Sequence, residues 1–138
     1  PLLSKKVELT VRKPEQFTLS NGLEVLYIKD PQVPMIQGSL LFPGGSFCEA
    51  SDELGLSSAT GSLLREGGVR GLSPEELDRR LDSKAAVIES SLGAEFGSVQ
   101  FSALAEDFDE VFSLFRRVVR EPTFDKTRLE LWRSRSLD

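Results

Sequence analysis

The spacing of apolar residues switches between period two and helical spacing along this chain, and this switching most limits the folds that it can adopt. Apolar and polar residues alternate on both sides of Asn21-Gly22, a dipeptide that strongly favours a tight hairpin turn. We therefore expect strands at about 16–20 and 23–29. A third extended apolar run, from Met35 to Phe42, ends at a Pro-Gly-Gly turn and predicts a third strand.

Helical spacing follows the third strand. Between Glu53 and Arg65, apolar residues recur at helical intervals, and Gly67-Gly68 provides a C-terminal stop. A second helix is expected to begin at Ser73-Pro74-Glu75-Glu76, a capping box with proline at the first helical position. The clearest helical pattern is an apolar stripe near an arginine-rich helix end, formed by Phe108, Val111, Phe112, Phe115, Val118 and Val119.

A second pair of strands separates the two pairs of helices. Residues 86–92 and 95–104 are expected to be strands that turn at Gly93, and a fourth helix carrying Leu129 and Trp132 runs toward the chain end. Strand pairs separated by helix pairs predict an α+β fold, in which helices pack on one face of an antiparallel sheet.

The length and charge of the chain restrict its function. Its 138 residues suit one compact domain, expected over 16–138, after a polar lead-in or edge strand at 1–15 that alternates at Val7, Leu9 and Val11. The net charge of −5 and pI of about 4.9 disfavour binding to nucleic acid, which is itself negative. No apolar run approaches the roughly 20 residues that cross a bilayer, so we expect no membrane insertion.

Histidine is absent from the chain, and Cys48 is its only cysteine. The absence of histidine excludes Ser-His-Asp triads and histidine-containing zinc sites within this chain. A single cysteine excludes an internal disulfide and a cysteine-rich metal site. We expect Cys48 to be a small buried or half-buried side chain. Three acidic pairs remain for carboxylate chemistry, each interpreted as a helix start where the dipole favours acids: Asp52-Glu53, Glu75-Glu76 and Asp107-Asp109.

Two glycine-rich segments do not have the spacing of phosphate-binding loops. Pro43–Ser46 and Glu66–Gly68 lack both the Gly-Lys-Ser/Thr ending and the G-x-G-x-x-G pattern, so we interpret them as turns. The cations Arg116, Arg117 and Arg120 are interpreted as the solvated end of a helix. The sequence therefore supports no nucleotide site.

Several short segments follow one another in a specific order: Phe17–Leu26, Gly44-Gly45-Ser46 with Glu49, Glu53–Leu56, Leu63-Leu64 before Glu66-Gly67-Gly68, and Phe124. In order and spacing they resemble the N-terminal domain of the insulinase/pitrilysin family of inverted-zincin metallopeptidases, over about residues 16–138. The family also includes mitochondrial processing peptidase and the core subunits of the cytochrome bc1 complex. The resemblance implies an α/β roll, of which this chain would be an incomplete part because a family domain is normally longer.

Catalytic members of this family carry H-x-x-E-H on the helix that the Gly-Leu pair opens, with two zinc ligands flanking a glutamate base. The resemblance places these three motif positions at Ser58, Gly61 and Ser62, where neither imidazole nor carboxylate is present. The third zinc ligand, a glutamate on a later helix close to the chain end, is not assigned, and Asp138 lies too near the end to be chosen. The resemblance thus implies no catalytic residue, no metal and no cofactor in this chain, with zinc only in a catalytic partner.

The function that the resemblance implies is that of a noncatalytic zinc-peptidase-like domain. Such a domain pairs with an active peptidase domain or subunit, in a homo- or hetero-oligomer, and helps to form the substrate chamber for peptide hydrolysis. The alternatives are a structural scaffold subunit with no role in proteolysis and a stand-alone hydrolase that uses the acidic pairs. Family habits suggest a periplasmic or extracytoplasmic location. If strands of the sheet are missing, an exposed edge should make the chain self-associate.

Overall fold

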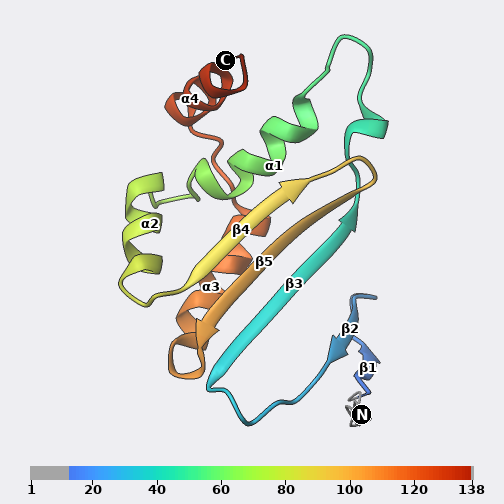
Figure 1. Cartoon of the computed structure of the whole chain (residues 1–138), viewed down its shortest axis with the longest axis vertical. Helices are drawn as coiled ribbons and strands as arrows, with labels where there is room; N and C mark the ends of the chain where they lie inside the picture. Colours follow the sequence, from blue (N-terminus) through green and yellow to red (C-terminus); the bar gives the residue numbers. More distant parts are fainter. Residues whose placement is uncertain (1–12, 138) are drawn as a thin grey trace, which may run out of the picture. The chain divides into compact units, whose positions relative to one another are not determined.

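The computed structural model describes residues 13–137 and divides the chain into two compact units, one ending at Val33 and the other beginning at Pro34 (Figure 1). The alternation at Val7, Leu9 and Val11 lies outside the described residues, as does Asp138. The edge strand expected at 1–15 and the domain boundary after it therefore stay predictions.

The first unit contains the predicted hairpin, with β1 (Glu15–Thr18) antiparallel to β2 (Glu24–Tyr27). The Asn21 side chain accepts a hydrogen bond from the Leu23 amide at 3.1 Å, and Gly22 takes a φ of 85°, which glycine adopts without strain. Near the turn the strands are shorter than expected. Leu19 and Leu23 belong to the loop there, which is closed by a hydrogen bond from the Leu19 amide to the Leu23 carbonyl.

The second unit is built on a three-stranded antiparallel sheet in the order β3-β5-β4 (Figure 1), formed by β3 (Met35–Pro43), β4 (Val87–Leu92) and β5 (Phe96–Leu104). Both β3 and β4 are edge strands of this sheet in the described part of the unit. The bounds of the three predicted strands are confirmed to within one or two residues. The predicted turn at Gly93 is present too, and it fixes the register of β4 against β5.

Four helices and two short 3-10 turns complete the second unit: η1 (Ser46–Cys48), α1 (Leu56–Glu66), α2 (Pro74–Asp82), η2 (Ala105–Asp107), α3 (Phe108–Arg120) and α4 (Lys126–Leu137). The Ser73 hydroxyl accepts a hydrogen bond from the Glu76 amide at 3.2 Å, as the capping box predicts. The predicted end of α1 is confirmed too, because Gly67 is its C-cap. None of the helices in residues 13–137 combines the length and apolar character needed to cross a bilayer.

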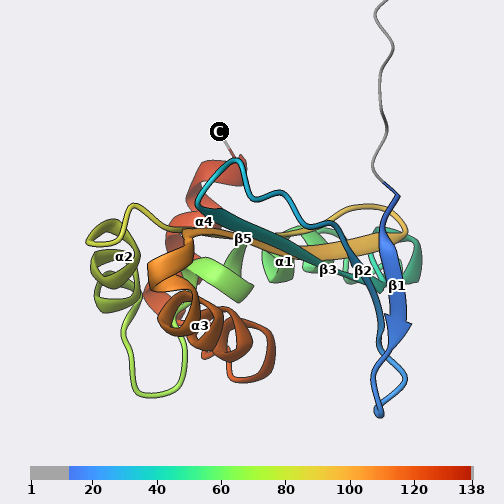
Figure 2. The ribbon, with the colours of Figure 1, turned by 90° about the horizontal axis from the view of Figure 1, so that it is seen from below.

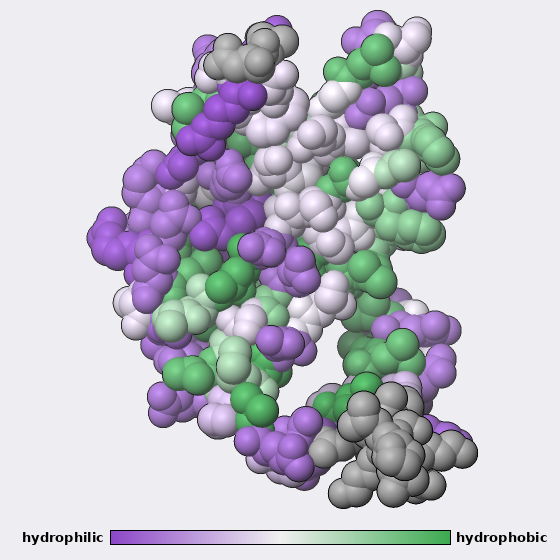
Figure 3. All heavy atoms as spheres, viewed as in Figure 1, coloured by the Kyte–Doolittle hydropathy of each residue, from purple (hydrophilic) through white to green (hydrophobic). Residues whose placement is uncertain are grey.

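The core lies between one face of the sheet and the helices (Figure 2). Val99 and Phe101 of β5 are buried against the predicted apolar stripe of α3, where Val111 and Val118 are fully buried. The Phe101 ring lies 5.0 Å from the Phe115 ring, centroid to centroid, within a cluster of phenylalanines. The opposite face of the sheet is open and carries mostly polar side chains (Figure 3), such as those of Gln37, Ser39, Gln100 and Ser102. The predicted α+β class is therefore confirmed.

The exposure of Cys48 differs from what the sequence predicts. Its side chain is exposed rather than buried or half-buried. The reason is its place in η1, a single turn held against the β4–β5 turn by two backbone hydrogen bonds, from Ser46 to Gly93 and from Phe47 to Ala94. Such a short turn has no second layer of structure over it.

Candidate functional site

The start of α1 is held by Glu49, which precedes the helix by several residues. The Glu49 carboxylate accepts hydrogen bonds from the Ser57 amide at 2.5 Å and from the Gly55 amide at 3.1 Å. The first turn of α1 contains no acidic residue of its own, so Glu49 supplies the negative charge that the helix dipole favours there. Hydrogen bonding from Ser57, and less from Gly55, lowers the pKa of Glu49.

This contact corrects part of the interpretation of the acidic pairs. Glu75 and Glu76 lie in the first turn of α2, as expected, and Asp109 lies in the first turn of α3. Asp52 and Glu53 do not serve as acids in the first turn of α1, because the helix begins only at Leu56 after an N-cap at Gly55. No capping pattern in the sequence pointed to Glu49, because its carboxylate reaches amides six and eight residues further along the chain.

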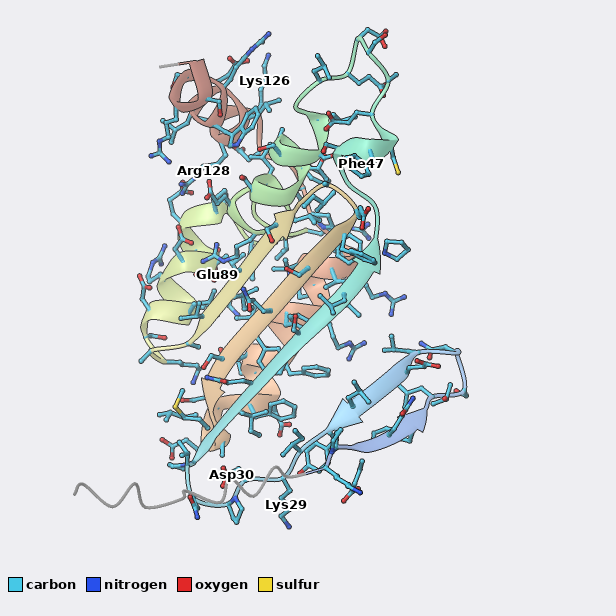
Figure 4. All side chains as sticks on the ribbon, turned by 45° about the vertical axis from the view of Figure 1, so that its right-hand side comes forward. Lys29, Asp30, Phe47, Glu89, Lys126 and Arg128 are labelled. Atoms are coloured by element: carbon cyan, nitrogen blue, oxygen red, sulfur yellow. The ribbon has the colours of Figure 1, made fainter. Side chains whose placement is uncertain are left out.

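The other acidic pairs have separate partners. Asp107 forms an ion pair with Lys84 at 2.6 Å. Glu75 forms an ion pair at 2.9 Å with Arg128 of α4, and Arg128 is labelled in Figure 4. Lys84 also reaches Glu110 at 3.1 Å, and hydrogen bonding to Asp107 and then to Glu110 raises its pKa. These carboxylates are therefore engaged at helix ends rather than directed at a common point.

The three motif positions in α1 differ in exposure. Ser58 is exposed, Ser62 is half-buried and Gly61 is buried. Neither serine hydroxyl is a good zinc ligand in comparison with imidazole, and Gly61 has no side chain to act as a base. In residues 13–137, no group of three or more His, Cys, Asp or Glu side chains is placed to hold a metal ion. The residues present do not fit a zinc ion.

Gly61 lies directly against β4. A Cβ atom at this position would come within 2.9 Å of the Ser91 carbonyl carbon and still closer to the Leu92 amide nitrogen, and both are backbone atoms that a rotamer change cannot move. The Gly61 carbonyl also accepts a hydrogen bond from the Ser90 hydroxyl at 2.6 Å. The absence of a side chain at Gly61 thus lets α1 approach β4 closely, and a glutamate there would require the helix to move.

The outer edge of β4 is covered by α1. The Gly93 amide donates to the Phe96 carbonyl, so Gly93 and Phe96 form a hydrogen-bonded pair. In an antiparallel ladder, hydrogen-bonded and non-hydrogen-bonded pairs alternate. Counting back along β4 from Gly93, Ile88 and Phe101 form a non-hydrogen-bonded pair. The backbone carbonyl of Ile88 consequently points away from β5, and Arg65 of α1 donates to it through Nε at 3.1 Å. The same guanidinium forms an ion pair with Asp78 of α2 at 2.7 Å.

A pocket of about 440 Å³ opens beside this edge, between α1, α2 and β4. Its charged groups are one cation, Arg65, and three acids: Glu66, Asp78 and Glu89 (labelled in Figure 4). Ser62 lines it as well, so the pocket borders a motif position. With serine, glutamine and carboxylate side chains around it, the pocket offers hydrogen bonds and negative charge. Sequence reasoning missed Arg65 and Asp78, since ion pairs between separate helices leave no local pattern.

Comparison with known protein families gives a match over most of the chain. The sequence profile described as Insulinase (Peptidase family M16) matches residues 24–136. A comparison with curated proteins finds no match.

Solved structures share the fold at low sequence identity. The inactive domain of a peptidase M16 protein from Pseudomonas fluorescens has a TM-score of 0.82 and 21% identity, over 90% of this chain and 30% of that one. The periplasmic protease PqqL from Escherichia coli has a TM-score of 0.76 and 19% identity, over 87% and 13% of the two chains. A protease from Helicobacter pylori has a TM-score of 0.68 and 20% identity, over 85% and 28%. The chain thus spans less than a third of the length of each of these proteins.

Replacement of Gly61 by alanine should destabilise the chain. In an open helix this change stabilises by up to about 1 kcal/mol, because alanine is the better helix former. Here the added methyl group would meet the backbone of β4, so we expect a loss of about 1–3 kcal/mol in the free energy of unfolding. Urea unfolding followed by circular dichroism measures the change. Ser58→Ala, at an exposed position of the same helix, is the control and should not destabilise; a gain in stability for Gly61→Ala would contradict the close packing.

The contribution of Glu49 to stability should depend on pH. Its pKa is lowered in the folded chain from an ordinary value of about 4.5, so its contribution is complete above that value and is lost as the pH falls through the lower folded-state value. Glu49→Gln should therefore lower the midpoint of urea unfolding at about pH 7 and have little effect near pH 2. Glu53→Gln provides the comparison, because Glu53 meets the start of α1 only through its backbone carbonyl, which accepts a hydrogen bond from the Leu56 amide at 3.0 Å and is kept in the variant. An equal effect of Glu49→Gln at both pH values would show that its charge is not involved.

Proposed function

The chain belongs to the insulinase family, peptidase family M16, and we propose that it is a noncatalytic peptidase-like domain that pairs with an active, zinc-bearing domain or subunit. In that assembly it forms part of the wall of the chamber in which peptides are hydrolysed. The observation that carries this proposal is the packing of Gly61 against the β4 backbone. Ser58 and Ser62 offer no imidazole, and at Gly61, the position of the glutamate base, even a Cβ atom would meet the β4 backbone.

Two further observations support this proposal. The fold resembles that of a domain named as inactive in a peptidase M16 protein, and the chain spans only 13–30% of the three structures compared with it above. A domain of this size cannot enclose a peptide by itself, so chamber formation requires other domains or subunits. Zinc would then be supplied only by the catalytic partner.

The purified chain should not hydrolyse peptides. We expect no cleavage of a fluorogenic peptide library with or without added Zn²⁺, because the chain offers no imidazole ligand and its acidic pairs are engaged at helix ends. Chelator-insensitive cleavage that disappears in Glu53→Gln or Asp107→Asn would instead assign a hydrolase activity to this chain and overturn the proposal.

Affinity capture of the intact protein that contains this chain, from extracts of its native cell, tests the pairing. Mass spectrometry should identify H-x-x-E-H either in a bound chain or elsewhere in the same polypeptide. The matched control is capture in the presence of high salt, which weakens contacts between charged surfaces. If neither source contains the motif, the chain is better described as a structural scaffold subunit with no role in proteolysis.

A further inference from the structure

Large apolar side chains are exposed around the loop between β3 and α1. Leu54 is 82% exposed and Phe47 is 74% exposed, far more than apolar residues that only border a core. Three more exposed side chains lie nearby, at the ends of β3 and β5 and at the start of α1, and we name the whole group the loop patch: Leu41, Phe47, Leu54, Leu56 and Phe96. Figure 3 shows green side chains at this upper right part of the molecule.

Backbone contacts hold the loop patch together. The amide of Phe47 donates to Ala94 at 3.0 Å, which fixes η1 on the turn that leads into Phe96. Pro43 lies opposite Phe96 in the register of β3 and β5, with Leu41 two residues along on the same face of the sheet. Glu49 ties the other end of the loop to the start of α1. The exposed apolar side chains therefore belong to an ordered surface.

Only acids accompany the loop patch. The sequence contains no Lys or Arg from residue 30 to 64 or from 85 to 115, the two segments that supply the patch. Asp52, Glu53 and Glu95 lie in the same loops as the exposed apolar residues. An apolar surface whose own loops carry carboxylates and no cation is complementary to a segment that combines apolar residues with lysine and arginine.

Helix α4 has this complementary character. Leu129 and Leu131 are each more than a third exposed, and Glu130 is the only acid between Lys126 and Leu137. Arg128 is engaged with Glu75 and Asp78 of α2. Within residues 13–137, by contrast, no ion pair involves the other three cations of α4: Lys126 (labelled in Figure 4), Arg133 and Arg135.

We propose that the loop patch binds helix α4 of a second copy of this chain. Within one molecule α4 packs against α1, and its Leu129 and Leu131 side chains and its cations Lys126, Arg133 and Arg135 remain exposed. Figure 1 shows α4 and the β3–α1 loop at the same end of the second unit. A two-fold axis at that end brings each α4 to the loop patch of the other copy, and the two equivalent contacts close the assembly as a dimer. The proposal does not depend on the noncatalytic role.

Sedimentation velocity of the 138-residue chain over a range of concentrations tests this dimer. We expect reversible association that weakens as salt increases, because part of the contact is ionic. Leu54→Glu should raise the dissociation constant by about tenfold or more, since it places a negative charge at the most exposed apolar side chain of the patch. Met35→Glu, a matched change at the far end of β3, should have no such effect. Circular dichroism confirms that each variant is folded.

Charge reversal distinguishes this contact from other modes of association. Asp52→Lys with Glu53→Lys, and separately Arg133→Glu with Arg135→Glu, should each weaken self-association, whereas a mixture of the two variants should associate. Two copies could instead associate by pairing the outer edges of their β3 strands. Gln37→Pro would block that pairing, because the Gln37 amide points away from β5 and proline removes this amide without breaking a hydrogen bond to β5. A wild-type chain that stays monomeric, or association that resists Leu54→Glu but is lost in Gln37→Pro, would overturn the proposal.

Discussion

The close approach of α1 to the edge of β4 is the contact on which the rest of the candidate site depends. It exists because Gly61 has no side chain, so that the helix backbone can lie against Ser91 and Leu92. A glycine in the middle of a helix costs about 1 kcal/mol in helix propensity, and the packing against β4 must offset that cost. The approach also brings Arg65 within hydrogen-bonding distance of the Ile88 carbonyl. One small residue thus sets the position of the helix, the cover of the sheet edge and the shape of the adjacent pocket.

The same contact underlies the noncatalytic role that we propose for this chain. A helix carrying H-x-x-E-H needs space around three side chains for a metal ion and a water molecule. Here the Gly61 backbone lies against β4 and Arg65 is paired with Asp78, so both residues help to hold the helix in place. Its N-terminus is held by Glu49 through two backbone amides, which keeps α1 in register against β4 without a metal ion.

Charge is unevenly distributed over the second unit, and the distribution follows its elements. Residues 30–64 and 85–115, which include the sheet and its loops, contain acids but no lysine or arginine. Helix α4, by contrast, is net positive, because Glu130 is its only acid against Lys126, Arg128, Arg133 and Arg135. Arg128 connects it to α2 by ion pairs with Glu75 and Asp78. The net charge of −5 is therefore the sum of acidic segments around the sheet and a basic helix α4.

The order and type of the elements and the absence of histidine chemistry follow from the amino-acid sequence alone. Period-two alternation around Asn21-Gly22 and helical spacing through α3 depend on local geometry, which neighbouring residues specify. The surroundings of Gly61 became visible only in the folded chain. The contact of Gly61 with β4, the bond from Arg65 to Ile88 and the exposure of Cys48 all depend on elements distant in sequence. Such contacts leave no periodic pattern, because they arise from how closely a helix and a strand pack and not from the propensity of either.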